Sequence, residues 1–500
     1  MLEWVRRAAR RVNEVDAELV RRSAALPRTV ADPALGAVTV AANHGLLWFS
    51  VAALLASRQG VTRRAALRGV AALAGASLTT NAVAKPLLPR RRPVDDLVPE
   101  HRRLADRPRS SSFPSGHAAS AAAFATAVAM ESPAAGAVVA PLAAAVAYSR
   151  VHTGVHWPSD VAGGALLGTA VAVATRRWWP VRPTTPGQAR ADERVPALTD
   201  GAGLLVLVNP ASGDQNHDPS AELARVWPAA TLVHPDGSDG EDLAETLDRV
   251  LHGDWSSVRA LGVAGGDGTV AAAAVVAARH GLPLVVVPAG TLNHFARDVG
   301  VPDLAGAAHA VAEGAAVRVD LAAVRVDDGP SRSFVNTASL GGYPEMVRLR
   351  ERWTGRWGKW AAGAAALVRV LAGAEPLTVR VDGQLTRVWL LFVGNNGYHP
   401  QGLAPAWRPR LDHARLDLRY VRADVRFSRL RFALAALTGA LTRSRVYVRQ
   451  ERQSVEVEVL GPPVALARDG EVSARGAEGN RFRFVARDRV LRVYRPAEID

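Results

Sequence analysis

The first 180 residues alternate long apolar runs with short charged segments. Residues 36–57 contain no Asp, Glu, Lys or Arg, and at about 1.5 Å per residue they can span a hydrocarbon core of about 30 Å. Further apolar runs rich in Ala and Gly lie near 69–88, 118–130, 133–149 and 159–175. Each run alone also fits a buried helix of a soluble bundle, but five runs with small residues suited to close helix contact favour a membrane bundle. We therefore predict an all-α transmembrane helical bundle over residues 1–178.

Two segments flank these runs. Residues 1–30 carry charges throughout, which argues against a secretory signal, and we expect 10–30 to lie in the membrane interface. Residues 176–203 combine an Arg and Trp cluster with prolines and polar residues, as in an interface anchor followed by a linker. We place the linker at 179–202.

The second half shows the pattern of a multidomain α/β protein. Short β-rich runs alternate with helical stretches; these runs are 204–208, 260–264 and 284–287. Strand, crossover and strand predict a parallel sheet, so we expect an α/β nucleotide-binding domain over 203–320. From 321 to 500 the helices thin out and short alternating segments such as Leu377–Val381 predict an antiparallel β domain.

Composition narrows the chemistry. The 500 residues include no cysteine, which removes disulfides, thiolate nucleophiles and cysteine-ligated metals. Hydrolysis or group transfer must therefore use His, Asp, Glu, Ser or Lys. The net charge of +14 favours an anionic partner, such as nucleic acid, a phospholipid surface or a phosphate substrate. No aromatic-rich recognition motif for nucleic acid is present, so we expect membrane lipids and no nucleic acid as partners.

Three clusters in the first half supply groups that phosphate chemistry needs: Lys85 to Pro93, Pro114 to His117, and Ser149 to Asp160. Lys and Arg neutralise phosphate oxygens, and free N–H groups at a helix start point at an anion. His156 and Asp160 are four residues apart, so on a helix the carboxylate can orient a nucleophilic imidazole. His117 would then be the general acid. Singly, each cluster also fits a structural role: a structural His, Arg90 to Arg92 holding lipid headgroups, or a helix cap.

Together and in this order, the clusters resemble the type-2 phosphatidic acid phosphatase superfamily. Its pattern K-x6-RP, PSGH and SR-x5-H-x3-D is matched at every position within roughly residues 10–178. The resemblance implies a metal-independent phosphohistidine mechanism with His156 as nucleophile, His117 as acid and Asp160 as orienting carboxylate. It also implies a phosphate cradle made of Lys85, Arg92, Ser115, Gly116 and Arg150. Membrane members of the family usually have one span more than the apolar runs predict here.

The order of the clusters constrains topology. The loops that carry them are separated by two predicted spans, so they lie on one side of the membrane, and the linker lies on the other. The seven arginines between 89 and 109 favour a cytoplasmic loop, whereas the resemblance implies an outside loop. We follow the resemblance, because phosphate gives these arginines another purpose. The prediction is a multi-pass cell-membrane protein with its phosphatase site outside.

A second site is predicted where three glycine-rich loops each follow a strand: Asn209 to Gly213, Gly265 to Thr269, and Pro288 to Ala296. Glycines let backbone N–H groups approach phosphate oxygens, and ligands bind at the carboxyl edge of such sheets. The loops match neither a Walker loop nor a GxGxxG fingerprint. One Gly-Gly pair alone is commonly just a tight turn, but three ordered loops predict a phosphate cradle.

These loops resemble the diacylglycerol kinase catalytic family, related to sphingosine kinases, from about Leu204 to Pro496. The resemblance implies a cytoplasmic kinase with ATP held by Asn209, Gly265, Gly266, Asp267, Gly268, Thr269, Gly290 and Thr291. It implies a magnesium ion, with Asp412 and Asp469 as candidate ligands, and a lipid hydroxyl deprotonated by Glu471. Other residues at expected places are Asp320, Asn336, Gly341 to Tyr343, Gly394 and Asn395. The family's D-D-G turn reads Asp412-His413-Ala414 here.

One segment of this half suggests membrane contact. Trp353, Trp357 and Trp360 recur at i, i+4 and i+7 among arginines and a lysine, which describes an amphipathic interfacial helix. A Trp face packed in a domain core fits the same pattern equally well.

The sequence thus predicts a bifunctional membrane lipid enzyme that uses ATP and Mg²⁺ in its kinase half and no cofactor in its phosphatase half. The main alternative is a lipid kinase whose N-terminal half serves only as membrane anchor or lipid-binding module. A soluble haloperoxidase-like use of the histidine site is disfavoured by the apolar helices around it. The phosphorylated lipid and the acceptor, diacylglycerol or another lipid alcohol, stay open.

Overall fold

The computed structural model describes residues 2–497, with gaps and with only scattered positions between 343 and 374. The gaps are 59, 105, 107, 109, 184, 192–194, 211–217, 235–242, 254–256, 291–292, 403–405 and 473–478. The chain forms two compact units, Met1–Arg182 and Pro183–Asp500, which are considered one at a time.

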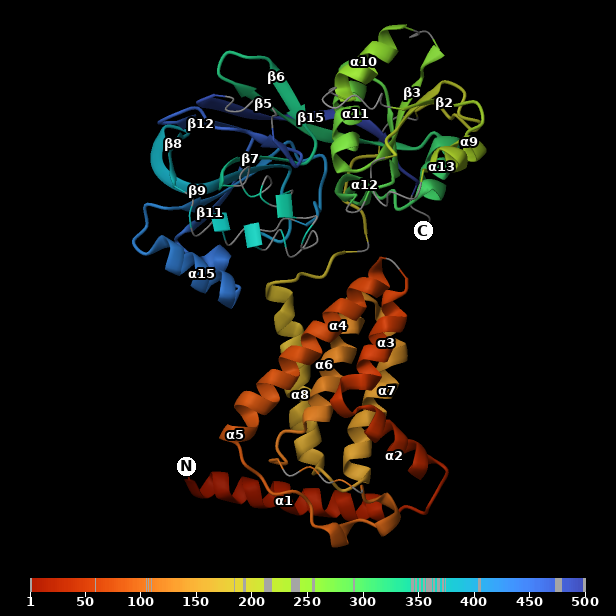
Figure 1. Ribbon diagram of the computed structural model, residues 1–500, viewed down its shortest axis with the longest axis vertical. Coiled ribbons are helices and arrows are strands. Elements are labelled where there is room, and N and C mark those ends of the chain that lie inside the picture. The colour runs from red at the N-terminus through yellow and green to blue at the C-terminus, as the bar shows by residue number, and fades with distance from the viewer. Residues whose placement is uncertain are drawn as a thin grey trace. The chain divides into compact units, whose positions relative to one another are not determined.

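The first unit is helical. Its helices are α1 (Leu2–Ala24), α2 (Ala31–Ala41), α3 (Leu46–Ala56), α4 (Val61–Leu78), α5 (Lys85–Leu87), α6 (Gly116–Glu131), α7 (Pro133–His152) and α8 (Pro158–Ala174). Figure 1 shows α3, α4, α6, α7 and α8 side by side as a bundle, with α1 running across one end. A six-residue π-helical turn, Thr79–Ala84, joins α4 to α5.

The apolar run at 36–57 differs from the predicted single span. It forms α2 and a helical segment, Asn43–Ala56, that bend by 70° relative to each other. His44 and Gly45 take φ angles of 54° and 77° at the break, a left-handed conformation that ends a right-handed helix. The prediction of one straight helix rested on apolar composition, which takes no account of the conformation of Asn43, His44 and Gly45 in the middle of the run.

The other runs also form helices, but few meet the length and hydropathy of a simple span. Among the described residues, only α7 does so alone, and the bent pair at 31–56 does so jointly. Helices α6 and α8 have 16 and 17 residues, and α4 carries Arg63, Arg64 and Arg68. Five complete spans are therefore more than the helix lengths support by themselves.

Small residues let the bundle helices approach closely around α6. A side chain at Gly164 or Gly168 of α8 would collide with the backbone of Ser115 or Ala119. A buried ion pair, with 2.8 Å between Arg68 Nη2 and Glu131 Oε1, joins α4 to the end of α6. Close packing of small residues is the way in which membrane helices associate.

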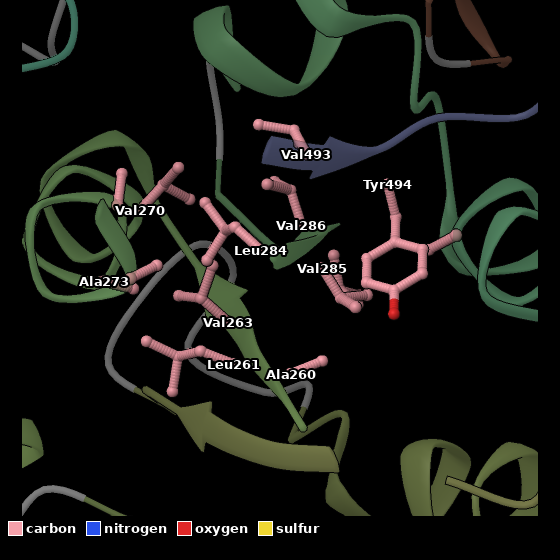
Figure 2. Packing of buried hydrophobic residues seen from close by; sticks show 14 of the residues in the cluster. Ala260, Leu261, Val263, Val270, Ala273, Leu284, Val285, Val286, Val493 and Tyr494 are labelled. Carbon is pink, nitrogen blue, oxygen red and sulfur yellow. The ribbon is translucent and has the colours of Figure 1, made fainter. Parts of the chain in front are cut away.

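The second unit begins with the predicted parallel sheet, in the order β2, β1, β3, β4. These strands are Thr231–Val233, Leu204–Val208, Ala260–Gly265 and Leu284–Pro288. The helices of this part are α9 (Ser220–Val226), α10 (Leu243–Gly253), α11 (Asp267–His280), α12 (His294–Val299) and α13 (Leu304–Glu313). Figure 2 shows Leu261, Val263 and Leu284 of the sheet gathered beside Val270 and Ala273 of α11.

The remaining strands are mainly antiparallel and have a core of their own. They are β5 (Ala316–Val326), β6 (Ser331–Phe334), β7 (Thr337–Gly341), β8 (Leu377–Val381), β9 (Gln384–Asn395), β10 (Leu416–Arg422), β11 (Tyr447–Arg452), β12 (Ser454–Val459), β13 (Ala467–Arg468), β14 (Glu471–Val472) and β15 (Arg481–Tyr494). Helix α15 (Ser428–Thr438) lies between β10 and β11 in the chain.

The boundaries between the predicted parts differ in two ways from expectation. Strand β5 crosses the predicted division at 320, and β15 pairs with both β5 and β4, so the two regions share one sheet. Val195 and Leu198, placed in the linker by composition, are buried in the core of the second unit. Proline and charge content marked this segment as a linker, but its two apolar side chains fasten it to the sheet.

Candidate functional sites

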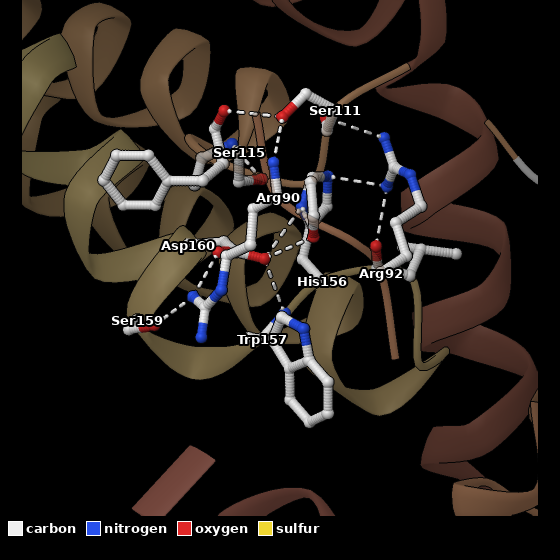
Figure 3. Close-up of polar contacts among 12 residues, drawn as sticks. Arg90, Arg92, Ser111, Ser115, His156, Trp157, Ser159 and Asp160 are labelled. Carbon is white, nitrogen blue, oxygen red and sulfur yellow. Dashed lines mark hydrogen bonds and ion pairs between the residues drawn. The ribbon is translucent and has the colours of Figure 1, made fainter. Parts of the chain in front are cut away.

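His156, in the loop between α7 and α8, has a defined partner on each ring nitrogen. Arg92 Nη1 lies 3.2 Å from Nε2 (Figure 3). Ser112 Oγ lies 3.4 Å from Nδ1. A guanidinium only donates hydrogen bonds, so Nε2 is the acceptor and the ring proton of neutral His156 belongs on Nδ1. The lone pair of Nε2 therefore faces the arginine.

Asp160 reaches His156 mainly through Ser112. The distance from Asp160 Oδ2 to His156 Nδ1 is 3.7 Å, too long for a direct hydrogen bond, and the Ser112 hydroxyl donates a short hydrogen bond to the same oxygen. The backbone N–H of Trp157 also donates to Oδ2, at 2.9 Å. The orienting role predicted for Asp160 thus has an intermediary that the sequence analysis missed. The serine run before Phe113 was the available signal.

Arg90 holds Asp160 from the other side. Its Nη1 donates to Asp160 Oδ1 at 2.7 Å, and its Nη2 donates to Asp16 Oδ2 at 2.8 Å and Asn13 Oδ1 at 2.6 Å, both on α1. The alternative that Arg90 holds lipid headgroups does not describe its position, because these side chains use its donors. The transverse helix α1 is thereby tied to the carboxylate behind His156.

The surroundings of His156 keep its ring neutral. Burial is the main cause that lowers the pKa of His156 to about 4; Asp160 acts to raise this pKa, and the positive charges of Arg92 and Arg150 act with burial to lower it. Removal from water penalises the charged form most, which is why burial dominates. At neutral pH the ring carries an available lone pair, as a nucleophile requires.

Three further predicted cradle residues, Lys85, Ser115 and Gly116, lie at or near the start of α6. Lys85 Nζ donates to Asn81 Oδ1 at 3.0 Å and to Ser110 Oγ at 3.4 Å. A side-chain carbon built on Gly116 would lie 3.8 Å from this ammonium, so Lys85 faces the helix start. Ser115 is the N-cap of α6, and its backbone N–H donates to the Asp160 carbonyl at 2.9 Å.

Arg150 is almost completely buried at the end of α7. Its Nη1 donates to Thr39 Oγ1 at 3.0 Å, and that hydroxyl lies 2.6 Å from Ser149 Oγ. Its Nε, by contrast, is buried without a hydrogen-bond partner among the described residues. An unsatisfied buried guanidinium N–H is costly unless a ligand accepts from it, so this group fits an anion-binding role.

His117, predicted as the general acid, contacts the broken helix. Its Nε2 lies 2.9 Å from Asn43 Oδ1, at the bend between α2 and α3. The sequence analysis did not single out Asn43; its signal was a polar Asn-His-Gly triplet inside an apolar run. The bend thus has a use, since it brings an amide to the candidate acid.

Helix α8 separates this site from the point where the chain leaves the bundle. Asp160 lies in its first turn, and Ala174 ends it about 20 Å further along the axis. Within the first unit, the predicted phosphatase residues and the start of the predicted linker therefore occupy opposite ends of one helix.

In the second unit, the three glycine-rich loops follow neighbouring parallel strands. Strand β3 pairs with both β1 and β4, so their carboxyl ends share one edge of the sheet. Asn209 Nδ2 donates to Thr269 Oγ1 at 3.0 Å, joining the first loop to the second. A side-chain carbon at Gly290 would lie 2.5 Å from the Gly266 α-carbon, so the second and third loops approach so closely that a larger residue does not fit.

The remaining nucleotide-loop residues are arranged around the start of α11. Gly265 ends β3, Gly266 is the N-cap of α11, and Asp267, Gly268 and Thr269 form its first turn. Asp267 Oδ1 accepts a hydrogen bond from the His294 N–H at 2.7 Å, which ties this turn to α12. Thr291 and residues 211–213 lie outside the described residues.

Of the two candidate magnesium ligands, Asp469 does not fit a resident site as it stands, whereas Asp412 keeps one buried oxygen, Oδ1, without a hydrogen-bond partner among the described residues. Asp469 accepts hydrogen bonds from three successive backbone N–H groups, at residues 335–337, which occupy both carboxylate oxygens. Asp412 accepts from the Arg190 N–H at 3.0 Å, and its other oxygen lies 3.5 Å from Arg410 Nη2. The described residues contain no group of three or more His, Asp or Glu placed to hold a metal.

Other residues at the expected places surround a buried arginine that the sequence analysis missed. Arg408 pairs with Asp298 at 2.7 Å and donates to Asn336 Oδ1 at 3.2 Å. Asn395 Nδ2 donates to the carbonyls of Asp320 and Val335. These contacts join the nucleotide part to the β-rich part. Glu471 begins β14, but its side chain lies outside the described residues, as do Tyr343, Trp357 and Trp360.

Comparison with known proteins gives two families. The PAP2 superfamily model matches residues 65–183, and the diacylglycerol kinase catalytic domain model matches residues 203–324. A diacylglycerol kinase of Mycobacterium tuberculosis is 31% identical over 284 residues, covering 54% of this chain and 88% of that protein. An undecaprenyl-diphosphatase of Sulfolobus acidocaldarius is 37% identical over 94 residues, covering 18% of this chain and 44% of that protein. The match to a crystal structure of a diacylglycerol kinase from Bacillus anthracis spans 59% of this chain and 97% of the chain in that structure, with 19% sequence identity and a TM-score of 0.40.

Proposed function

The chain belongs to the diacylglycerol kinase family and carries a PAP2 superfamily domain ahead of its kinase part, and on this premise we propose a bifunctional membrane lipid enzyme. One site removes phosphate from a lipid phosphate through a phosphohistidine. The other transfers phosphate from ATP to a lipid hydroxyl, with diacylglycerol as the first acceptor to test.

The observation that carries the phosphatase proposal is the polarity of His156, with its Nε2 lone pair beside Arg92 and its Nδ1 toward Ser112. Nε2 attacks phosphorus, a P–N bond forms, and the bond from phosphorus to the lipid oxygen breaks as His117 protonates that oxygen. Water then attacks the phosphohistidine while His117 takes its proton, which releases phosphate and restores His156. Asp160, through Ser112, stabilises the positively charged ring of the intermediate.

The phosphate oxygens require positive groups around this nitrogen. Arg92 is already adjacent, Lys85 faces the start of α6, and the unpartnered Nε of Arg150 offers a further donor. Fixed donors aimed at developing negative charge are usually the largest contribution to such catalysis. No step in this half needs a metal ion.

The kinase proposal rests on the convergence of three loops at one sheet edge. Gly265 to Thr269 and Gly290 give close backbone access to the phosphates of ATP, and Asn209 links the loops. Magnesium accompanies ATP as part of the substrate, with Asp267 as the nearby carboxylate. Glu471 is proposed as the base for the lipid hydroxyl. In phosphoryl transfer, the protein mainly positions groups and neutralises charge.

We further propose that the bundle is embedded in the cell membrane, with the phosphatase site outside and the kinase in the cytoplasm. The apolar α7, the bent pair at 31–56 and the opposite ends of α8 support this placement. A single Cys at position 106 should react with an impermeant reagent on intact cells, whereas one at position 190 should react only after the cells are opened. The reverse labelling would contradict the placement.

The decisive experiment uses the purified full chain with labelled ATP and a lipid panel, with and without magnesium, and follows both product classes by mass spectrometry. His156→Ala should abolish phosphate release and leave kinase turnover near that of the native chain, whereas Asp267→Asn should impair the kinase and leave phosphate release intact. His309→Ala, an exposed histidine on α13, is the matched control and should leave both activities intact. Phosphate release by the His156 variant would exclude the phosphohistidine. Kinase activity with no phosphatase turnover on any lipid would favour the anchor alternative.

A further inference from the structure

Helix α15 has two apolar faces, and only one of them serves the fold. Phe432 and Ala435 are buried against Val421, Val446 and Tyr447 of the β-rich part. This contact fixes the helix beside β10 and β11 at the periphery of the unit (Figure 1). The second apolar face is exposed on the surface of the unit.

Four large apolar side chains line that second face. Phe427, Leu430, Leu434 and Leu437 are 63%, 59%, 52% and 72% exposed. Within the helix, the spacing of four and three residues places Leu430, Leu434 and Leu437 along one side, roughly opposite the buried pair. Phe427 is the N-cap residue directly before the helix. We call these four residues the α15 stripe. Single exposed apolar residues are normal on a protein surface, but a contiguous exposed stripe marks an interaction site.

Exposed arginines lie in and beside the helix that carries the stripe. Residues 425–445 include five arginines and no Asp or Glu; the arginines are Arg426, Arg429, Arg431, Arg443 and Arg445, all exposed. The Arg426 guanidinium lies 4.9 Å above the Phe427 ring, so a cation and an apolar side chain are presented together. The Arg429 guanidinium lies 4.4 Å above the Trp389 ring. An apolar stripe bordered by arginines is typical of a helix that lies in a membrane interface.

We propose that the α15 stripe docks the kinase unit onto a bilayer that contains anionic lipid. The apolar side chains enter the boundary of the acyl chains, and the arginines bind headgroup phosphates. Charge complementarity selects this partner: each Arg or Lys near an anionic surface strengthens partitioning roughly fivefold. A second copy of the chain would bring the same five arginines together, and the repulsion disfavours that pairing.

Docking would serve the proposed lipid kinase by holding its loops at the surface where the acceptor hydroxyl lies. Only this purpose rests on the proposed function, because binding of the stripe to a bilayer requires no kinase activity. The membrane contact predicted from Trp353, Trp357 and Trp360 is a different segment, most of which lies outside the described residues.

The chain has no cysteine, so a fluorophore can be placed at one position on the full chain. Leu434→Cys reports on the stripe, and Leu385→Cys, 64% exposed on β9, is the matched control. Each labelled protein is reconstituted into phosphatidylcholine vesicles with or without phosphatidylglycerol, and a nitroxide-labelled lipid serves as quencher. Quenching at 434 should exceed quenching at 385 several-fold and increase with phosphatidylglycerol.

Equal quenching at the two positions would overturn the proposal. So would a label at 434 that is shielded in detergent without lipid and unquenched by nitroxide lipid in vesicles, since that result identifies a protein contact on the stripe.

A second measurement tests the consequence for catalysis. The double variant Leu430→Asp, Leu434→Asp changes exposed positions only and should lower kinase turnover on diacylglycerol in vesicles about tenfold. Turnover on a water-soluble short-chain diacylglycerol and phosphate release should stay unchanged. Full activity of the double variant on vesicles would contradict the proposal. If the native chain phosphorylates no lipid, the proposed kinase function fails, but the fluorescence result still decides the docking.

Discussion

Arg90 and Asp160 are joined by an ion pair of 2.7 Å, and the carboxylate is completely buried. The other end of the same guanidinium holds Asp16 and Asn13 of α1. Arg90 contributes nothing to the K-x6-RP pattern, yet it fixes the carboxylate that stands behind the candidate nucleophile. It is therefore a positioning residue.

Replacing Arg90 should separate turnover from substrate binding. In Arg90→Ala, Asp160 loses its charge partner and shifts away from Ser112, so we expect kcat of the phosphatase to fall about tenfold to a hundredfold with KM little changed. The free energy of unfolding should drop by about 2 kcal/mol, because a mostly buried pair is broken. Arg90→Lys should recover part of the turnover. Arg91→Ala, at the exposed neighbour, is the control; a large KM effect at Arg90 would instead indicate contact with substrate.

Ser112 should matter as the intermediary between Asp160 and His156. Ser112→Ala removes the hydroxyl that contacts both side chains, so we expect phosphatase kcat to fall about tenfold. Steady-state kinetics of this variant beside Ser57→Ala, an exposed serine at the end of α3, provides the measurement. Unchanged turnover would mean that the carboxylate acts directly at 3.7 Å or not at all.

The lowered pKa of His156 predicts the acid side of the phosphatase pH profile. Because burial brings this pKa to about 4, kcat/KM should stay level from pH 7 to about 5 and fall only near pH 4. A fall centred near 6.5 would indicate a solvated histidine.

The lowered pKa of His156 also predicts that acid destabilises the fold. The unfolded chain binds more protons than the folded chain between roughly pH 6.5 and 4, so acidification through this window lowers the free energy of unfolding. Chemical denaturation of the native chain and His156→Gln, compared at pH 7 and 5, measures that loss.

Glu471 and Asp267 should affect the kinase in different ways. Glu471→Gln keeps the size and loses the proton acceptor, so turnover should fall by roughly 10²- to 10⁴-fold while ATP affinity changes little. Asp267→Asn should weaken the productive binding of magnesium and ATP instead. Turnover and nucleotide affinity measured side by side decide between them. If Glu471→Gln is nearly silent, Asp469 to Glu471 is only a turn.

Removal of divalent metal should stop the kinase activity and leave the phosphatase activity intact. With excess chelator, ATP-dependent lipid phosphorylation should stop, because magnesium accompanies the nucleotide, whereas phosphate release should persist. The phosphatase residues include no metal-binding group among the described side chains. Strong inhibition of phosphate release by the chelator, reversed by added metal, would require a different hydrolytic mechanism.

Sequence predicted best what depends on residue identity and order. The three polar clusters of the first half and the glycine loops of the second are local, and each contains its own chemistry. The contacts of Ser112, Arg90 and Asn43 were not predictable in this way, because their partners lie 44 to 77 residues away in the chain. The π-helical turn before Lys85 has no comparable signature either.

Apolar periodicity leaves two features of the chain undetermined. The run at 36–57 reads as one helix by composition, but two residues with positive φ divide it. Helix α15 was not singled out in the sequence, and apolar periodicity does not say which of two apolar faces is covered. Only the fold shows that Phe432 is inside and that Leu434 is exposed.

The position of the candidate phosphatase residues at one end of α8 has a consequence for the consumption of ATP in the cell. A kinase and a phosphatase acting on one pool of lipid would consume ATP without net product. Under the proposed placement, the bundle stands between the two reactions, with Asp160 at one end of α8 and the start of the linker beyond its other end, so each reaction draws on a different leaflet. A lipid phosphorylated on one face becomes a substrate on the other only after it crosses the bilayer. The rate at which the lipid crosses the bilayer, rather than the turnover of either site, then limits repeated phosphorylation and dephosphorylation of the same lipid.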